Sequence, residues 1–223
     1  MKIIGHRGAK GLAPENTIAS LMKAIEHHVD EIECDVRVTK DHVAVLMHNG
    51  HLIDQSGTKL AISQHSYAKL LAHKPDLARM DEAIRAVNRA VPIQFELKSG
   101  VVVHPAVAIL KDFLKNGWEA PDFLIGSKSY SALKEAHKQL PEVKKVVIER
   151  WSGLRATSRA RRLGTKRLSM NHWWLWSGFV RMVASRGYEL YPYTVNRIDR
   201  VNRLAKYGLS GVITDYPDRF EDS

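Results

Sequence analysis

Residues 31–38, with the sequence EIECDVRV, alternate between ionisable and apolar side chains. Successive side chains of a β-strand point to opposite faces, so this stretch predicts a strand with one ionisable face and one apolar face. The ionisable face carries Glu31, Glu33, Asp35 and Arg37, and the apolar face carries Ile32, Cys34, Val36 and Val38. In a barrel the apolar face packs beneath helices, so we expect the carboxylates to point toward the barrel axis or its mouth.

Eight short apolar runs of this kind, each bounded by turn residues, recur along the chain. The expected strands are Lys2–His6, Glu31–Val36, Ile93–Leu97, Phe123–Gly126, Lys145–Glu149, Arg167–Met170, Glu189–Tyr193 and Gly211–Thr214. Most gaps hold segments with helical spacing, which are Asn16–His28, Val107–Leu114, Ser131–His137, Gly178–Ser185 and Asp199–Tyr207. Strands that alternate with helices predict parallel β/α units, and eight units are the number in a closed (β/α)8 barrel.

An insertion separates the second and third expected strands. Their starts lie 62 residues apart, whereas the other strand starts lie 22 to 30 residues apart. We therefore expect one α/β barrel domain over residues 1–223, with a small insertion at about residues 49–80 and a short extra strand at Val43–Met47. A doubly wound open sheet is the alternative, but its dinucleotide-binding signature requires Gly-x-Gly-x-x-Gly after the first strand. Gly5, Gly8 and Gly11 have a different spacing.

The composition indicates a folded globular protein. Of the 223 residues, 44% are hydrophobic and 26% are charged, which argues against a disordered or fibrous chain. No apolar run approaches the ~18 residues of a membrane span, and the single Cys34, expected in the core, suits a reducing compartment; we expect a cytoplasmic protein. The net charge is +10, and residues 101–223 hold 21 Lys+Arg against 12 Asp+Glu. This excess favours anionic partners, namely phosphate compounds, nucleic acid or an anionic membrane surface.

A second strand repeats the alternation and adds a carboxylate to the interior. In Ile93–Leu97, Glu96 shares a face with Gln94, so Glu33, Asp35 and Glu96 are expected to point inward together. Buried like charges need a compensating cation, and three carboxylates without His or Cys suit Mg²⁺ or Ca²⁺ better than Zn²⁺. The alternative is a buried salt-bridge network with Arg7, Arg37 and Lys98.

Two histidines are candidates for acid–base catalysis. His6 ends the first expected strand, and His48 follows the extra strand. The C-terminal ends of barrel strands meet at the mouth, which places His6 on the same rim as the three carboxylates. Two histidines beside a bound cation suit phosphoryl transfer. One imidazole accepts a proton while the other donates one, and cations spread the charge of the phosphate. The sequence carries no signature of an α/β-hydrolase, a P-loop NTPase or a His-Glu-x-x-His zinc protease.

At these residues the sequence resembles the glycerophosphodiester phosphodiesterase family, in particular its bacterial cytoplasmic members. The matching motifs, in chain order, are His6-Arg7-Gly8, Pro14-Glu15-Asn16-Thr17, Glu33-x-Asp35, Thr39-Lys40-Asp41 followed by His48, Glu96-Leu97-Lys98, Tyr193-Thr194-Val195-Asn196 and Gly211-Val212-Ile213-Thr214-Asp215-Tyr216-Pro217. Each motif alone is weakly specific, but their order and spacing along nearly the whole chain are highly specific.

The resemblance implies a function and a set of site residues. It implies a (β/α)8 barrel that hydrolyses glycerophosphodiesters to sn-glycerol 3-phosphate and an alcohol. It implies one divalent cation, Mg²⁺ or Ca²⁺, with Mn²⁺ as a further option. The residues implied are His6 and His48 as the catalytic acid–base pair, Glu33, Asp35 and Glu96 as metal ligands, and Arg7 and Lys98 as contacts to the substrate phosphate.

The sequence departs from the family pattern around the second histidine. Asn49 stands where the family usually has Asp, and an Asn can orient the imidazole but cannot offset its positive charge. Asp41-His42 replaces an Asp-Gly turn, residues 54–56 (DQS) replace an RTT stretch, and Tyr193 replaces the Trp of the WTVN motif. We expect these changes to affect substrate choice and rate rather than the reaction type.

Two further features each have two interpretations. Six basic residues without an intervening acid form either a solvated helix face or a contact for an anionic surface; they are Arg155, Arg159, Arg161, Arg162, Lys166 and Arg167. Three tryptophans follow the sixth expected strand and either pack under the rim of the barrel or form a wall for the leaving group or a lip that touches a membrane; they are Trp173, Trp174 and Trp176.

Three functions are therefore weighed. The favoured one is a metal-dependent phosphodiesterase with a small-molecule substrate and no nucleic-acid partner, with transient contact to an anionic membrane surface as a further option. The second is a lysophospholipase-D-like phosphodiesterase at a membrane surface. The third is a non-catalytic barrel that binds anions or nucleic acid, which rests on the net charge alone. The sequence indicates no oligomeric state.

Overall fold

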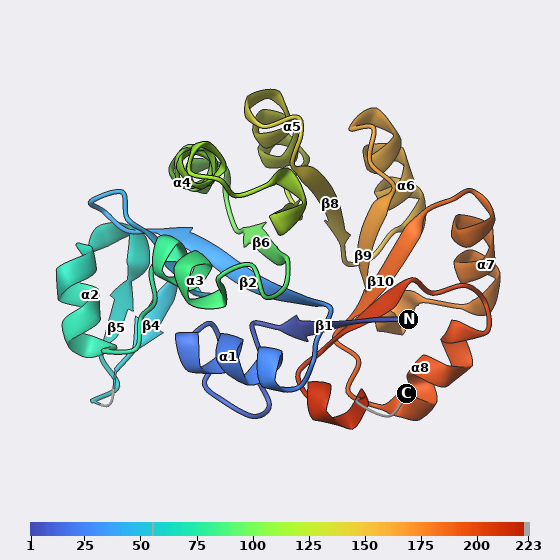
Figure 1. The fold of residues 1–223 in the computed structure, drawn as a ribbon, viewed down its shortest axis with the longest axis horizontal. Helices are drawn as coiled ribbons and strands as arrows, with labels where there is room; N and C mark the ends of the chain where they lie inside the picture. Colours follow the sequence, from blue (N-terminus) through green and yellow to red (C-terminus); the bar gives the residue numbers. More distant parts are fainter. Residues whose placement is uncertain (55, 221–223) are drawn as a thin grey trace.

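Eight parallel strands lie at the centre of the computed structural model, which describes residues 1–54 and 56–220 (Figure 1). In their order around the sheet they are β10 (Glu189–Tyr193), β9 (Arg167–Asn171), β8 (Lys144–Glu149), β7 (Phe123–Ser127), β6 (Ile93–Leu97), β2 (Glu31–Val38), β1 (Lys2–His6) and β11 (Gly211–Thr214). The two end strands also approach each other, because the N–H of Ser210 donates to the carbonyl of Leu190 over 3.2 Å. The sheet therefore forms a nearly closed barrel, and the predicted (β/α)8 fold is confirmed.

Helices surround the strands (Figure 1). They are α1 (Ile18–Glu26), α3 (Met80–Val87), α4 (Val103–Lys115), α5 (Tyr130–Gln139), α6 (Gly153–Arg162), α7 (Ser177–Ser185) and α8 (Ile198–Ala205). The helix-facing side of β2 is apolar as predicted, since Ile32, Cys34 and Val36 are fully buried in the main core. Thr17 caps α1 by accepting a hydrogen bond from the N–H of Ser20. Within the described residues, no helix has the length and apolar character needed to cross a membrane.

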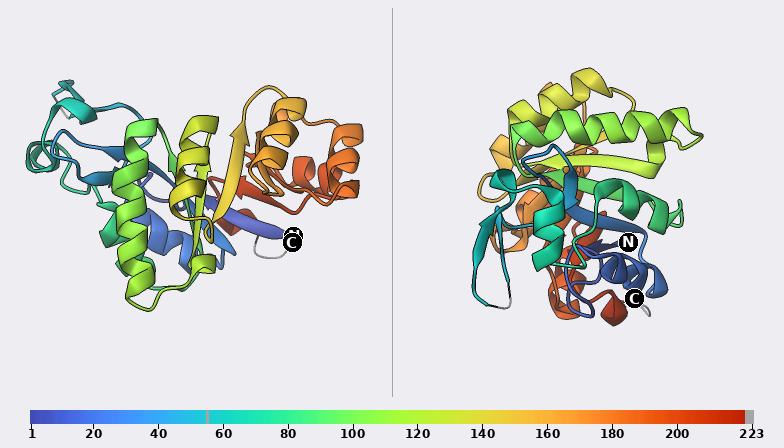
Figure 2. Two further views of the ribbon diagram at one scale, coloured as in Figure 1. Left: turned by 90° about the horizontal axis from the view of Figure 1, so that it is seen from above. Right: turned by 90° about the vertical axis from the view of Figure 1, so that its left-hand side faces the viewer.

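The insertion stands to one side of the barrel (Figures 1 and 2). Its first strand, β3 (Ala44–Leu46), pairs antiparallel with the end of β2 and corresponds to the predicted extra strand. Three short elements that were not predicted follow: β4 (His51–Ile53), β5 (Lys59–Ala61) and α2 (Tyr67–His73). A small core of their own holds them together; it contains Val45, Leu52, Leu60, Ile62, Leu70 and Leu77.

An ion pair closes the floor of the barrel, at the end opposite to the mouth. Nη2 of Arg167 donates to both carboxylate oxygens of Glu31 over 2.7 and 2.8 Å, and the guanidinium carbon lies 4.0 Å from the ring centre of Tyr191. Both charged side chains are at most 3% exposed. Placing Arg167 in an exposed basic run was therefore wrong, because this residue starts β9 and its side chain points into the barrel.

Candidate active site

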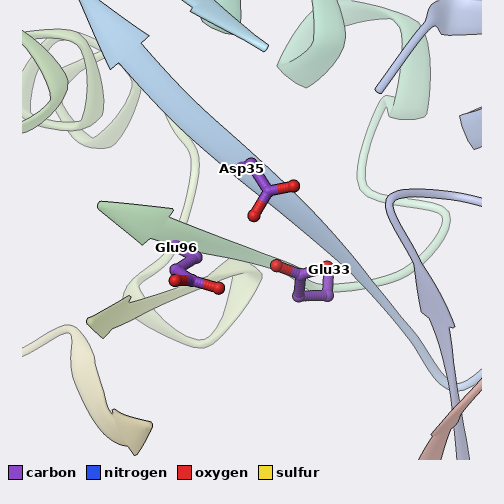
Figure 3. Close-up of side chains that lie close together, drawn as sticks. All are labelled: Glu33, Asp35 and Glu96. Atoms are coloured by element: carbon purple, nitrogen blue, oxygen red, sulfur yellow. The ribbon is translucent and has the colours of Figure 1, made fainter. Parts of the chain in front are cut away.

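Three carboxylates from neighbouring strands converge inside the mouth of the barrel (Figure 3). Glu33 and Asp35 come from β2 and Glu96 from β6, and the parallel register places Asp35 beside Glu96. One oxygen of each lies within 4.8 Å of the others, although each residue is at most 7% exposed. The structure thus brings together the three side chains that the alternating pattern placed on interior faces.

Two cations and an amide surround Asp35. Nζ of Lys98 lies 2.5 Å from Asp35 and 2.8 Å from Glu96, and Nε of Arg7 lies 3.0 Å from Asp35. Asn16 donates to the Asp35 carboxylate and accepts from its backbone N–H, both over 3.0 Å. Burial opposes ionisation of Asp35, but Lys98 and Arg7 prevail and lower its pKa to about 2. The salt-bridge network considered above therefore exists with Arg7 and Lys98.

Glu33 is the carboxylate of this cluster that the cations compensate least. Its polar neighbours are the backbone N–H of Arg7 at 3.2 Å and Nε2 of His6 at 4.0 Å. Burial raises the pKa of Glu33 well above its ordinary value, and the like charges of Asp35 and Glu96 add to this effect. Three convergent carboxylates, of which Glu33 has no Lys or Arg as an ion-pair partner among the described residues, are a donor set that fits a hard divalent cation.

In the turn after β1, backbone N–H groups point toward β2 and the carboxylate cluster. Arg7 and Gly8 both have positive φ, 53° and 82°, and the N–H of Gly8 donates to the carbonyl of Glu33 over 3.2 Å. A Cβ at Gly8 would lie 2.4 Å from Oγ of Ser20 in α1. Glycine is therefore required at this position both for the left-handed conformation and for the close approach of the helix.

His6 is held by a carboxylate from the far end of the chain. Its Nδ1 lies 2.6 Å from Oδ1 of Asp215, which directly follows β11. Asn196 fixes Asp215 by donating to Oδ2 over 2.8 Å and accepting its N–H over 2.9 Å. Burial opposes ionisation of Asp215, but its hydrogen bonds with His6 and Asn196 lower its pKa. Since an ionised carboxylate only accepts, Nδ1 of His6 carries a proton and Nε2 is left for the cavity.

His48 is held by an amide instead. Its Nδ1 lies 2.9 Å from Oδ1 of Asn49, and because an amide oxygen only accepts, Nδ1 carries the proton and Nε2 can accept one. Arg37 donates to the carbonyl of His48 over 2.9 and 2.7 Å, so it fixes this segment rather than joining the carboxylate network. Burial lowers the pKa of His48, against the opposing effect of Asp35.

Both histidines line one cavity of about 240 Å³ at the mouth. The cavity is also lined by Arg7, Lys98, Glu33, Glu96, Lys128, Arg150, Asn171, Tyr193 and Thr194. A second cavity of about 250 Å³ shares His48, Glu96, Lys98 and Lys128 with the first and extends to Asn49 and His51. The histidines, the cationic side chains and the carboxylates therefore lie together where the two cavities adjoin.

Comparison with known families agrees with this geometry. The sequence profile described as "Glycerophosphoryl diester phosphodiesterase family" matches residues 6–219. The chain belongs to this family. It is a phosphoric diester hydrolase, so the interpretation as a non-catalytic binding barrel is dropped.

Individual relatives span nearly the whole chain. A glycerophosphodiester phosphodiesterase of Caldanaerobacter subterraneus subsp. tengcongensis is 27% identical over 97% of this chain and 94% of its own length. A phosphodiesterase of Oleispira antarctica, solved in complex with the product sn-glycerol-3-phosphate, has a TM-score of 0.88 at 24% identity over 99% of this chain and 95% of its own. The glycerophosphodiester phosphodiesterase of Thermotoga maritima has a TM-score of 0.84 at 23% identity over 99% and 96%. These structural likenesses show the shared fold.

The departures from the family pattern lie in or near the site. His42, in the position of a turn glycine, has a φ of 63°, a conformation that glycine adopts more freely. Tyr193, in the position of a Trp, lines the cavity and donates to the carbonyl of Glu149 over 3.4 Å. In the stretch 54–56, Asp54 accepts a hydrogen bond from the Ser56 side chain over 2.6 Å, and residue 55 lies outside the described residues.

Four residues of the site were not predicted from the sequence: Asp215, Asn196, Lys128 and Arg150. Asp215 and Asn196 lie within the two closing motifs, and their position just after β11 and β10 was the available signal. Lys128 follows β7 and reaches Glu96 over 3.3 Å, and Arg150 follows β8. Both lie at C-terminal strand ends, where barrel enzymes carry their functional residues.

The basic residues between 155 and 167 do not form one surface. Arg155 and Arg159 pair with the buried carboxylate of Glu149, over 2.6 and 3.3 Å, although the Arg155 side chain is still 49% exposed, and Arg167 is part of the floor. The remaining members, Arg161, Arg162 and Lys166, are exposed. This run is therefore divided among three environments.

Proposed function

We propose that the chain hydrolyses glycerophosphodiesters to sn-glycerol 3-phosphate and an alcohol, with one divalent cation held by Glu33, Asp35 and Glu96. The observation that carries the proposal is the meeting of His6, His48 and this carboxylate cluster on one cavity. Mg²⁺ or Ca²⁺ suits the three oxygen donors, with Mn²⁺ as a further option. When bound, the cation would offset the phosphate charge and polarise a phosphate oxygen.

The chain's own cations would hold the phosphate. Lys98 and Arg7 line the cavity, and their ion pairs with the carboxylates fix both side chains before a substrate arrives. A phosphodiester carries two ester groups, and the two cavities that meet at Lys98 and His48 offer room for both. Pre-positioned charges of this kind stabilise the transition state without reorganisation.

The two imidazoles would move the protons. As the oxygen of the attacking water forms a bond to phosphorus, neutral His48 accepts a proton of that water at Nε2, since its Nδ1–H is bound to Asn49. His6, whose Nδ1 is held by Asp215, donates a proton from Nε2 to the oxygen of the departing alcohol as the P–O bond breaks. One proton is taken and one is given in each cleavage, which is general acid–base catalysis by a pair of histidines.

The proposal is tested with a panel of glycerophosphodiesters and lysophospholipids, each assayed with Mg²⁺, Ca²⁺, Mn²⁺ or EDTA and analysed by phosphorus NMR. We expect sn-glycerol 3-phosphate and a free alcohol from the glycerophosphodiesters. His6→Ala and His48→Ala should each lower kcat by about 10²–10⁴-fold, with an unchanged melting temperature as evidence of folding. Release of free glycerol with a phosphorylated alcohol, or normal turnover of His48→Ala, would contradict the proposal.

A further inference from the structure

Exposed apolar side chains gather at the mouth of the barrel. Ten large hydrophobic residues are exposed in the described part of the chain. Seven of them lie in segments that follow C-terminal ends of barrel strands; these are Val101, Trp151, Leu154, Trp173, Trp174, Trp176 and Ile198. Trp173 is 78% exposed and Trp176 67%. A soluble protein rarely leaves such a group uncovered, and a concentration of this kind marks an interaction surface.

The tryptophans are held in an ordered frame, which we call the lip and define as residues 150–155, 172–176 and 197–203. The rings of Trp151 and Trp174, from two successive loops, pack edge to face with centres 5.3 Å apart. Arg200 of α8 donates to the carbonyls of His172 and Leu175 over 2.8 and 3.3 Å. The lip therefore presents its aromatic rings in fixed positions, at low entropic cost for a contact.

The lip is also strongly cationic. It contains five arginines and a single acid, Asp199. A cavity of about 370 Å³ beside Trp173 is lined by Arg197, Arg200 and Arg203, and also by Asp199, which pairs with Arg197 over 2.9 Å. In the described structure, Nε of Arg200 and Nδ1 of His172 are buried without a hydrogen-bond partner. Unpaired nitrogens next to arginines suit an anionic oxygen ligand such as a phosphate group.

This combination of side chains fits the surface of an anionic lipid bilayer. Indole rings favour the headgroup level of a membrane, where one part of the ring is apolar and the N–H is wet. Arginines beside them attract anionic headgroups, each by about fivefold in affinity. A nucleic-acid duplex, whose bases are stacked on one another, would account for the arginines but not for an exposed patch of four indoles and Leu154. A single strand, whose bases can stack on indole rings, is a competing ligand in the test.

We propose that the lip docks onto the surface of an anionic bilayer. The lip residue Arg150 and the lip's neighbours Asn171 and Thr194 line the active-site cavity, so docking turns that cavity toward the headgroups. The proposal goes beyond the hydrolytic function, because docking requires no cleavage and is measured without a substrate turnover.

Co-sedimentation with sucrose-loaded vesicles tests the proposal. The vesicles are phosphatidylcholine alone or phosphatidylcholine with phosphatidylglycerol. We expect binding to the anionic vesicles to be at least about tenfold tighter. The double variants Trp173→Ser/Trp176→Ser and Arg197→Gln/Arg203→Gln should each lose about tenfold. Matched controls on other surfaces, Met22→Ser on α1 and Arg161→Gln/Arg162→Gln on α6, should bind as the wild type does.

Wild-type fluorescence gives an independent readout that needs no variant. Four of the five tryptophans lie in the lip, and Trp118 packs instead against Phe113 and Phe123. Lipids brominated near the headgroup should therefore quench most of the tryptophan emission in anionic vesicles.

Three results would overturn the proposal. The first is no preference for anionic vesicles, or no quenching. The second is a loss of binding with the α6 control that equals the loss with the tryptophan variant. The third is binding to a short DNA duplex or to a DNA single strand that is tighter than binding to the anionic vesicles.

Discussion

His6 and His48 differ in the group that holds each imidazole, and at the scale of single residues this difference assigns their roles. A carboxylate lies 2.6 Å from Nδ1 of His6, whereas an amide oxygen lies 2.9 Å from Nδ1 of His48. The carboxylate of Asp215 can offset a positive charge on His6, but Asn49 can only orient His48. His48 is therefore suited to act as a base in its neutral form.

Replacing Asn49 by Asp should shift the pH dependence of the reaction. A carboxylate next to Nδ1 raises the pKa of His48, because it stabilises the imidazolium. A base is active when deprotonated, so the acidic limb of the kcat/KM profile should move upward by about one pH unit. Superimposable profiles of wild type and Asn49→Asp would show that residue 49 does not tune His48.

Replacing Asp215 by Asn should slow the chemical step without weakening substrate binding. The amide no longer offsets the charge of His6, so we expect kcat to fall by about 10²-fold or more while KM changes little. In the double variant His6→Ala/Asp215→Asn, kcat should be almost the same as in His6→Ala alone, because the two residues act as a unit. The exposed Asp76→Asn is the matched control. A kcat for Asp215→Asn within threefold of wild type would exclude this positioning role.

The sequence predicts some site residues better than others for a physical reason. The twofold period of a strand places Glu33, Asp35 and Glu96 on interior faces, so local pattern reveals them. Asp215 acts through a contact with a residue 209 positions away. The position of Asp215 just after a strand marks it as a candidate for the mouth. Its pairing with His6 depends on the closure of the barrel, which neither segment shows by itself.

At the scale of elements, strands were predicted closely and several helices were missed. The eight barrel strands carry dense apolar runs, and their observed bounds differ little from the expected ones. α6 is absent from the expected helical segments, although a solvated helix face was one interpretation of the basic run. Only Ala156 and Ala160 of its ten residues are buried, so it has no broad apolar stripe. β4 and β5 have three residues each and depend on the insertion's own core. α3 does carry a helical apolar pattern, so that signal was available.

Removing one partner of the floor ion pair should destabilise the barrel. Arg167→Met leaves Glu31 buried without its ion-pair partner, at a cost of about 3–5 kcal/mol in the free energy of unfolding. The double variant Glu31→Leu/Arg167→Met removes both charges and should recover most of this loss. Urea denaturation measures both, with the exposed Arg162→Met as control. Equal stabilities of Arg167→Met and Arg162→Met would mean that the pair does not stabilise the floor.

At the scale of the whole molecule, the barrel separates stability from chemistry. Its floor holds the buried ion pair of Glu31 and Arg167, while its mouth holds the three carboxylates, both histidines and the lip. The fold was predictable because each β/α unit is a local pattern repeated along the chain. The grouping of exposed tryptophans was visible only in part, since Trp151 joins the other three from a different loop.

Metal dependence is decided most directly by one rate measurement. The protein is freed of metal with EDTA, and hydrolysis of glycerophosphocholine to sn-glycerol 3-phosphate is followed as Mg²⁺ or Ca²⁺ is returned. The wild type should lose activity by about 10²-fold or more and regain it with the cation. Glu119→Gln, a change at an exposed acid, should behave in the same way, whereas Glu96→Gln should not recover at the same concentration. Full activity of the wild type in EDTA, or full recovery of Glu96→Gln, would contradict a metal held by Glu33, Asp35 and Glu96.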